Sequence, residues 1–418
     1  MAELPKLAVF YEPHSVSIFD VSEAARDLCH LVWVIGWAPD PPAHRALTRF
    51  GEVVDVTGMG DEQIVEHVVA AQPDGVIVFN DVPMRLAAAV ADALGLRFHS
   101  VATAQLLTDK FAQRTALAAA DVPGPGFWPV DADADPAATE AIVAELSYPV
   151  VLKPKEGMGS RNTYLVTDAD MLRRLLHEAQ RDAEDMLIEE VITETHARDE
   201  QVFADVLSVD SLVSEGRIVH LVVAGHFVPA PPFRGTGLFV PSHLSEVEAK
   251  AVFAATEAAI RALGIRNGFL DTDLILTSDG PRVLEVNGRI GGQIPTLLQL
   301  AGAPPLVPEA MRFALRLSDG DVVPLSSGPV GFFTMYQSPV EAERLVQLAG
   351  LDVVAALPGV TNVVANLQVG DALDWQQGTM SRLFTVYGVA DDHDHLARLY
   401  EQILGSVVVR YEPAGAST

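Results

Sequence analysis

Two acidic residues stand on opposite arms of a short predicted hairpin. The segment FLDTDLILT, a turn centred on Asp279 and the segment PRVLEVNGR predict two strands joined by a tight connection. If the strands pair symmetrically about Asp279, Asp273 lies opposite Glu285, with Cβ atoms roughly 4.5–5.5 Å apart. Opposed like charges destabilise a sheet, so we expect this pair to hold a cation.

Asn287 and Arg289 follow Glu285 on the same face, because side chains alternate along a strand with a period of two. Two carboxylates and an amide oxygen make an all-oxygen site that suits Mg²⁺ carrying nucleotide phosphates. Arg289 would then offer a planar, multidentate donor to the same phosphates. The competing interpretation is a pair of solvated acids on an exposed face of the sheet.

Two lysines are candidates for binding those phosphates. Lys153 ends the apolar strand PVVL and precedes the loop Gly157-Met158-Gly159-Ser160, whose backbone N–H groups can approach a phosphate closely. Lys110 falls in the first turn of a predicted helix capped by Thr108, a poor position for a cation unless an anion binds there. The alternatives are a strand-end lysine that reaches solvent and an ordinary exposed lysine.

The segment Ile188-Glu189-Glu190-Val191-Ile192 places two acids inside a strand. Adenine has a donor amino group beside an acceptor ring nitrogen, and a strand edge can match them with one C=O and one N–H. A carboxylate can accept from the amino group or the ribose. An edge strand with solvated acids explains the same pattern.

The elements expected to position these groups indicate an α/β and α+β fold. Apolar strands at 7–13, 30–36 and 75–80 alternate with helical spacing, which predicts a doubly wound parallel sheet at the N-terminus. Strand-rich hairpins follow. The predicted units are an N-terminal α/β domain (1–102), a small lobe (103–187), a large lobe with the metal site (188–318) and a small C-terminal α+β domain (319–418).

Composition excludes several classes of protein. The formal net charge of −28 over 418 residues argues against a nucleic-acid-binding surface. No apolar run reaches the roughly 18 residues of a membrane span, and the N-terminus predicts a first strand, not a signal peptide. The single cysteine, Cys29, lies at the entrance of an apolar strand, which predicts a buried thiol and fits a cytoplasmic protein.

Together these segments resemble the ATP-grasp superfamily over roughly residues 1–310, in the order that the family uses. The matching segments are Thr108-Asp109-Lys110 with Arg114, Val151-Leu152-Lys153-Pro154 with the glycine loop, Ile188-Glu189-Glu190, Asp273, Leu284-Glu285-Val286-Asn287, and Gly288-Arg289-Ile290-Gly291-Gly292. The resemblance implies an ATP-grasp fold with a preceding parallel-sheet domain, and ATP as a substrate.

The resemblance also implies roles for individual residues. Those for ATP are Lys110, Lys153, Gly159, Ser160, Glu189, Glu190, Val191, Ile192 and Glu200; two Mg²⁺ ions, replaceable by Mn²⁺, would be held by Asp273, Glu285 and Asn287; and Arg289 would be catalytic with Lys153 and contact substrate with Gly291 and Gly292. Asp273 departs from the family's usual Glu. The insertion THARDEQ leaves Glu194 and Glu200 both open as the ribose-binding acid.

A narrower resemblance is to the L-amino-acid ligases, which form dipeptides from unprotected amino acids. It rests on residues 203–210 (FADVLSVD) and on PSHL after the Pro-rich stretch 226–243. That stretch is predicted to be a loop shaping the substrate pocket, with His226, Arg234 and His243 as polar contacts or as packing residues. The implied substrates are a small-molecule carboxylate and an amine, and specialised metabolism such as antibiotic biosynthesis fits the composition.

The predicted reaction is ATP-dependent amide formation through an acyl phosphate. One alternative is a biotin-carboxylase-like or purine-pathway carboxylase, because the tail GDALDWQQGTMSRLFTVYGVADD resembles the C-terminal domain of that branch. Another is a non-catalytic nucleotide-binding regulatory protein. Relatives are often dimers, so a homodimer is an open option.

Overall fold

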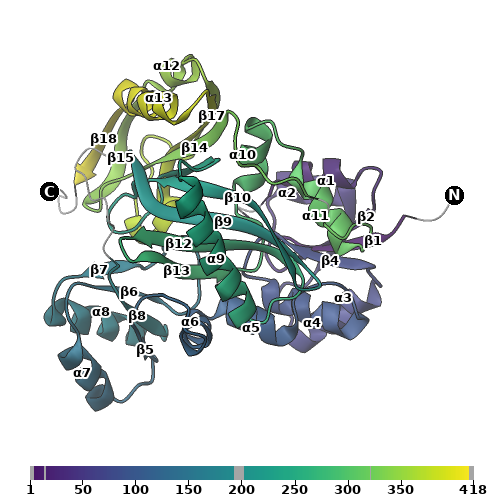
Figure 1. Ribbon diagram of the computed structural model, residues 1–418, viewed down its shortest axis with the longest axis horizontal. Helices are drawn as coiled ribbons and strands as arrows, with labels where there is room; N and C mark the ends of the chain where they lie inside the picture. Colours follow the sequence, from purple (N-terminus) through teal and green to yellow (C-terminus); the bar gives the residue numbers. More distant parts are fainter. Residues whose placement is uncertain (1–3, 14–15, 193–201, 321, 414–418) are drawn as a thin grey trace.

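The computed structural model describes residues 4–13, 16–192, 202–320 and 322–413. Its N-terminal part is a parallel sheet with the strand order β3-β2-β1-β4 (Figure 1). The strands are β1 (Lys6–Phe10), β2 (His30–Ile35), β3 (Gly51–Asp55) and β4 (Gly75–Val78). The predicted parallel sheet is therefore present, but β3 was not foreseen. In this edge strand only Val54 is buried, so its sequence lacks the apolar run that marks its neighbours.

Helices cover both faces of this sheet, as a doubly wound arrangement requires. They are α1 (Ile18–Ala25), α2 (Pro41–Phe50), α3 (Asp61–Ala70) and α4 (Met84–Leu94). The Ser17 and Asp40 side chains cap α1 and α2, and Gly95 ends α4 in a left-handed conformation with φ of 65°. Cys29 is buried, as predicted, and burial raises the pKa of its thiol to about 12.

Two consecutive helices, α5 (Val101–Thr108) and α6 (Lys110–Ala119), lead into the next layer. The prediction that Thr108 caps the second helix is wrong. Thr108 is the last residue of α5 and donates to the carbonyl of Ala104, while the Asp109 carboxylate caps α6 by accepting from the Ala112 N–H at 2.9 Å. Lys110 is the first residue of α6, in the first turn as predicted.

A small antiparallel sheet follows, with the order β5-β8-β6-β7. Its strands are β5 (Phe127–Val130), β6 (Val150–Pro154), β7 (Tyr164–Val166) and β8 (Met186–Glu190), and its helices are α7 (Pro136–Glu145) and α8 (Ala169–Arg181). The glycine loop joins β6 to β7. An apolar cluster that includes Val143, Leu152, Leu172 and Ile188 holds the two helices against the sheet.

The central sheet has eight strands in the order β13-β12-β9-β10-β11-β14-β17-β16. They are β9 (Phe203–Ser214), β10 (Arg217–Phe227), β11 (Gly237–Val240), β12 (Gly268–Thr277), β13 (Gly280–Asn287), β14 (Val330–Gln337), β16 (Val360–Ala365) and β17 (Arg382–Ala390). Strands from beyond residue 319 thus extend the same sheet as the predicted metal-site hairpin. The division of the chain at residues 102, 187 and 318 stays a prediction.

Strand β11 lies inside the stretch 226–243 that was predicted to be a loop, so that part of the prediction is wrong. Phe239 and Val240 are fully buried, and β11 pairs with both β10 and β14. The Pro and Gly residues on either side of this four-residue strand hide it in the sequence.

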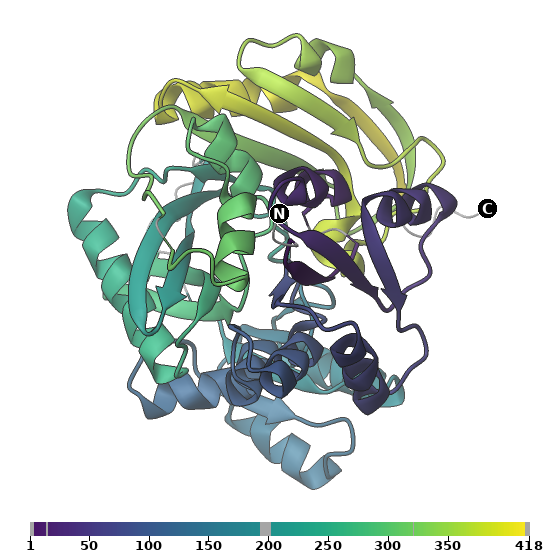
Figure 2. The ribbon, with the colours of Figure 1, turned by 90° about the vertical axis from the view of Figure 1, so that its right-hand side faces the viewer.

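The remaining elements cover the central sheet and its C-terminal end. They are α9 (Glu246–Ala262), α10 (Ile294–Leu300), α11 (Leu306–Ala314), β15 (Ala342–Ala349), α12 (Leu351–Ala355), the 3-10 helix η1 (Trp375–Ser381), α13 (His393–Ser406) and β18 (Val408–Pro413). Figure 2 shows the purple N-terminal elements beside the green helices α10 and α11. Trp33 and Met311, both fully buried, belong to the core that joins these two parts. In the described part of the chain, no helix is long and apolar enough to cross a membrane.

Candidate active site

At its acidic end the hairpin β12–β13 pairs in the register that the sequence predicts, whereas next to the turn the pairing differs by one residue. Asp273 lies directly opposite Glu285, and Asp271 lies directly opposite Asn287. The ladder shifts by one residue between Asp273 and Leu274, toward the turn. The two carboxylates are therefore neighbours on one hairpin, which is the arrangement on which the metal hypothesis depends.

Strand β9 extends this polar face to a third strand. Ser208 is the partner of Asp273, and Asp210 is the partner of Asp271. The hydroxyl of Ser208 donates to Asp273 Oδ1 at 2.6 Å, and Asn287 Nδ2 donates to Asp273 Oδ2 at 3.4 Å. Asp273 is thus held from both sides.

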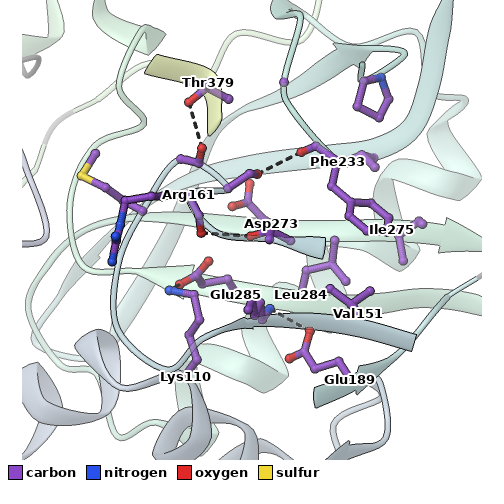
Figure 3. A pocket seen from close by; sticks show the side chains of 18 of the residues that line it. Lys110, Val151, Arg161, Glu189, Phe233, Asp273, Ile275, Leu284, Glu285 and Thr379 are labelled. Atoms are coloured by element: carbon purple, nitrogen blue, oxygen red, sulfur yellow. Dashed lines mark hydrogen bonds and ion pairs between the residues drawn. The ribbon is translucent and has the colours of Figure 1, made fainter. Parts of the chain in front are cut away.

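A cavity of about 430 Å³ lies over the hairpin (Figure 3). Its lining includes Lys110 of α6, Lys153 of β6, the loop from Gly157 to Arg161, the linker from Glu189 to Ile192, Asp273 with Glu285, and Thr379 of η1. The tertiary structure therefore brings both predicted lysines, the glycine loop, the linker and two of the three predicted metal ligands to one place.

Lys110 connects the glycine loop to the hairpin. Its Nζ lies 3.0 Å from Glu285 Oε1 and donates to the Gly157 carbonyl at 2.6 Å. Burial acts to raise the pKa of Glu285, but Lys110 and Lys153 outweigh it and lower that pKa. Glu285 is therefore a carboxylate at neutral pH.

Lys153 and Arg114 share the buried carboxylate of Glu189. Lys153 Nζ lies 2.7 Å from Glu189 Oε2, and Arg114 Nε lies 2.7 Å from Oε1. Burial opposes ionisation of Glu189, yet Lys153 and Arg114 lower its pKa to about 2. Burial also lowers the pKa of Lys153, against the pull of Glu189. Both oxygens of Glu189 face cations at the wall of the cavity, and its role toward the nucleotide stays a prediction.

Arg289 lies between two acids that the sequence analysis missed. Its Nε is 3.1 Å from Asp81 Oδ2, and its Nη1 is 2.5 Å from Asp271 Oδ2. Burial opposes the charge of Arg289, but Asp81 and Asp271 raise its pKa. Asp271 was detectable because it stands two residues before Asp273, on the same face of the strand. Asp81 was not detectable from the sequence, because it follows strand β4 of the N-terminal sheet, far from the hairpin in the chain.

Three carboxylates, of which Asp210 and Asp271 are buried, are crowded around that arginine. Burial and the charge of Asp271 raise the pKa values of Asp210 and Asp273 well above the ordinary value. Asp210 Oδ2 and Asp271 Oδ1 are buried and have no hydrogen-bond partner among the described residues. Buried charges of one sign need a counter-charge, so an added cation fits this face.

The donor set also fits a divalent metal by its chemistry. Asp273, Glu285 and Asn287 supply only hard oxygen donors, as Mg²⁺ requires. Within the described residues, however, no three His, Cys, Asp or Glu side chains converge as a complete metal site. An ion bound here would use Asn287, phosphate oxygens and water as well. The prediction of two ions stays a prediction.

Residues 107–293 match the model of a family described as "ATP-grasp domain". This stretch contains both lysines, the glycine loop, the linker and the acidic hairpin. The chain carries an ATP-grasp domain.

Several proteins are distantly similar to this chain. An uncharacterized protein, y4rH, from Sinorhizobium fredii is 27% identical over 72% of this chain and 60% of its own length. An L-arginine-specific L-amino acid ligase from Bacillus subtilis is 23% identical over 72% of each chain. The crystal structure of an L-amino acid ligase from Bacillus licheniformis has a TM-score of 0.77 at 20% identity, over 99% of this chain and 100% of that one. This likeness shows the shared fold.

Of the three polar residues predicted around the Pro-rich stretch, only His226 lines the cavity of the ATP-grasp domain. Its Nε2 lies 2.8 Å from Ser208 Oγ, and burial lowers the pKa of His226 to about 4. Because Ser208 gives its proton to Asp273, His226 must donate to Ser208 and carry its proton on Nε2.

Arg234 and His243 lie elsewhere. Arg234 is 1% exposed, and its guanidinium donates to the carbonyls of Pro231 and Ser338. His243 is exposed and packs near Phe203 and His393, with ring centroids 5.3 and 6.0 Å away. Both residues make structural contacts away from the cavity lining, which is the packing alternative.

Gly291 and Gly292 follow Arg289 at the edge of the ATP-grasp domain. The Gly291 N–H donates to Asp210 Oδ1 at 2.8 Å, and a Cβ at Gly291 would lie 2.9 Å from Asp210 Oδ2. Gly292 borders a separate cavity of about 630 Å³ between α1 and the segment from Gln293 to Arg312. Glu194 and Glu200, the two candidates for the ribose, lie outside the described residues.

Proposed function

We propose that this chain is an ATP-dependent carboxylate–amine ligase that joins an amino acid, or a related carboxylic acid, to an amino acid or peptide. The observation that carries the proposal is the pairing of Asp273 with Glu285 at the base of a cavity that also contains Lys110 and Lys153. Acids and lysines in one cavity suit a metal-bound triphosphate, because the lysines can pair with the negative phosphates and the acids can hold the metal ion.

The nucleotide would occupy the 430 Å³ cavity. Its adenine would lie between Val151, Ile192 and Leu284, with the backbone of Glu190 to Ile192 matching the base edge. Its phosphates would extend toward Lys110, Lys153 and the glycine loop with Gly159 and Ser160. Glu189 would act on the nucleotide indirectly, by fixing the ammonium group of Lys153.

Mg²⁺ or Mn²⁺ would be held by Asp273, Glu285 and Asn287. When bound, the ion would neutralise charge on the phosphoryl group that is transferred. Ser208 keeps Asp273 in place through its 2.6 Å hydrogen bond. This contact matters because the aspartate arm is one methylene shorter than the glutamate usual in the family.

The reaction would proceed in two displacements. A carboxylate oxygen of the first substrate attacks the γ-phosphorus, the bond to the β–γ bridging oxygen breaks, and ADP leaves. The amine nitrogen of the second substrate then attacks the acyl carbon, phosphate leaves, and the ammonium protons are released. Arg289 would stabilise the negative charge of both steps, and the enzyme would act by positioning and electrostatics without a covalent nucleophile.

The relatives support the substrate class. Two of them are named as L-amino acid ligases, one of them arginine-specific. The chain spans 60% of the length of y4rH and 72% of the length of the arginine-specific ligase. The choice of donor and acceptor therefore belongs to this proposal and needs direct measurement.

The decisive experiment is a phosphate-release screen with Mg²⁺, ATP and pairs of amino acids and small peptides, with the amide confirmed by mass spectrometry. Glu285→Gln should reduce Mg²⁺-dependent release by at least about a hundredfold, because the metal site loses a charged ligand. Asp279→Asn, on the exposed turn of the same hairpin, is the matched control and should retain activity. Equal activity of the two variants would refute the metal assignment.

The same screen separates the alternatives. ADP formation that depends on bicarbonate and needs no amine would favour a carboxylase. ATP binding without ADP formation over the whole substrate panel would indicate a non-catalytic nucleotide-binding protein.

A further inference from the structure

A segment close to the C-terminus contacts the glycine loop directly. The 3-10 helix η1 (Trp375–Ser381) follows the loop by more than two hundred residues and lies outside the matched ATP-grasp domain. Thr379 nevertheless lines the candidate nucleotide cavity, and Figure 3 shows it at the upper edge beside the loop.

Backbone hydrogen bonds join the two segments. The Thr379 N–H donates to the Gly159 carbonyl at 2.8 Å, and the Thr379 hydroxyl donates to the same oxygen at 3.3 Å. The Asn162 N–H donates to the Gln376 carbonyl at 2.9 Å. Both ends of the loop tip are therefore tied to η1.

Side chains extend this contact to strand β7. Gln376 Nε2 donates to the Tyr164 hydroxyl at 2.8 Å. The rings of Tyr164 and Trp375 meet edge to face, with centroids 5.5 Å apart. The indole fluorescence of Trp375 can therefore report a change at this contact.

Gly378 makes the approach of the two backbones possible. Its φ is 62°, a left-handed conformation that favours glycine. A Cβ at this position would lie 2.0 Å from the Gly159 carbonyl oxygen and 2.7 Å from the Ser160 carbonyl carbon. Any side chain at residue 378 must therefore push η1 and the loop apart.

The loop is also held from its other side. Ser160 Oγ donates to the Phe233 carbonyl at 2.9 Å. Gln337 Nε2 donates to the Gly235 carbonyl at 3.0 Å and to the Thr379 carbonyl at 3.4 Å. Gln337 therefore links the two segments between which the loop tip lies.

The loop needs this outside support because of its own conformation. Gly157, Gly159, Ser160 and Asn162 all have positive φ, at 129°, 64°, 58° and 48°. Successive backbone N–H groups in such conformations form concavities that bind anions. Ser160 and Asn162 adopt left-handed φ at a cost in free energy, so the conformation persists only where neighbouring contacts hold it.

We propose that Gly378 and Thr379 are positioning residues for the phosphate of the nucleotide. They hold the glycine loop in the conformation that binds a nucleoside triphosphate, and they close the cavity against water during acyl transfer. This inference rests on the proposed function, because it takes the loop as the phosphate-binding element. It adds that a segment outside the ATP-grasp domain completes the nucleotide site.

The test compares two glycine substitutions, Gly378→Ala and Gly370→Ala. Both glycines have positive φ, 62° and 102°, but a Cβ at Gly370 meets no atom within 4 Å. The second variant therefore carries the backbone strain without the clash against the loop. Thr379→Val and Thr379→Ser complete the set, because the first removes only the hydroxyl bond and the second restores it.

The first readout needs no nucleotide. Hydrogen exchange in the peptide that contains residues 157–162 should be about tenfold faster in Gly378→Ala than in Gly370→Ala, as expected when one or two hydrogen bonds are lost. The fluorescence of Trp375 should change in the same variant. Equal exchange in the two variants would overturn the proposal even if the protein proves to be an active ligase.

The second readout uses MgATP and the amino acid pair found in the screen. Gly378→Ala should raise the KM for ATP about tenfold and should raise the ratio of phosphate released to amide formed, because water enters an open site. Thr379→Val should raise the KM for ATP and the ratio of phosphate to amide by a smaller factor. Thr379→Ser should leave both quantities unchanged. A fall in kcat with an unchanged KM and an unchanged ratio of phosphate to amide would indicate a merely structural role and overturn the proposal.

If the wild-type chain uses no ATP with any substrate pair, the proposed function is refuted. Hydrogen exchange still decides in that case whether η1 holds the loop.

Discussion

Arg289 contacts the carboxylate of Asp81 at 3.1 Å, although the two residues are 208 positions apart. Asp81 follows the last strand of the N-terminal parallel sheet, and Arg289 follows the acidic hairpin of the central sheet. The N-terminal sheet therefore places a charged group beside the arginine that we propose to stabilise the transferred phosphoryl group.

We expect Arg289→Met to lower kcat by at least about a hundredfold with little change in ATP affinity, because charge stabilisation is lost mainly in the transition state.

Asp81→Asn should lower kcat by roughly tenfold, because one charge-assisted hydrogen bond to Arg289 is weakened. Steady-state phosphate release measures both. Asp319→Asn, which changes an exposed carboxylate paired with Arg97 at 2.9 Å, is the control. Undiminished turnover of Arg289→Met would remove this residue from the mechanism.

The hydrogen bond from Ser208 to Asp273 predicts a metal phenotype. Ser208→Ala should raise the Mg²⁺ concentration for half-maximal activity by roughly tenfold or more, because a group that orients a metal ligand is removed. Direct Mn²⁺ titration by electron paramagnetic resonance should show the same shift without turnover. Ser211→Ala provides a matched control, since the hydroxyl of this buried serine on the same strand bonds to His220 at 2.9 Å and not to Asp273. Identical metal affinities for the two variants would contradict the orienting role of Ser208.

Glu189 should be needed for folding as well as for the site. Glu189→Gln leaves Lys153 and Arg114 buried without their shared counter-charge, so we expect a loss of about 3–5 kcal/mol in the free energy of unfolding. Urea denaturation of the purified protein measures this loss. The exposed pair of Glu23 with Arg26 provides the comparison, and Glu23→Gln should change stability little. A loss no larger than in that control would mean that the buried cluster contributes no net stability.

A pH dependence of stability follows from His99. Burial lowers the pKa of His99 from its ordinary value of 6.5 to about 4, and its Nε2–H donates to the Gly288 carbonyl at 2.9 Å. Between pH 6.5 and about pH 4, His99 is therefore protonated in the unfolded chain but neutral in the folded chain. The free energy of unfolding accordingly falls as the pH is lowered through that range.

His99 alone should account for a loss of roughly 2 kcal/mol between about pH 7.5 and about pH 5. His99→Gln keeps a donor for the Gly288 carbonyl but cannot titrate, so its unfolding free energy should fall less over the same range. Urea melts at the two pH values give the comparison. An equal pH dependence in the variant and the wild type would show that His99 is not the responsible group.

The local parts of the site were predictable because they depend on short-range geometry. That Asp273 and Glu285 meet on one hairpin follows from the short sequence that joins the two strands, although their exact pairing also depends on the one-residue register shift between Asp273 and Leu274. The same holds for Lys110 at the start of a helix and for Lys153 at the end of a buried strand. The parallel N-terminal sheet was predictable from the alternation of apolar runs and helical stretches.

Errors arose where local signals were weak or competed. Thr108 and Asp109 are both good capping residues, and the choice between them depended on where α5 ends. The edge strand β3 carries little apolar sequence, and β11 is flanked by Pro and Gly.

What the sequence determined by itself was the set of chemical groups and their order: two lysines, a glycine loop, a linker and an acidic hairpin. Only the tertiary structure decided which distant groups meet them. Asp81 beside Arg289, Asp210 beside Asp271 and Thr379 on the glycine loop each join segments that lie far apart in the chain. The physical reason is that hairpin and helix geometry are governed by neighbouring residues, whereas these contacts depend on how whole sheets pack, and no local pattern of residue types records that packing.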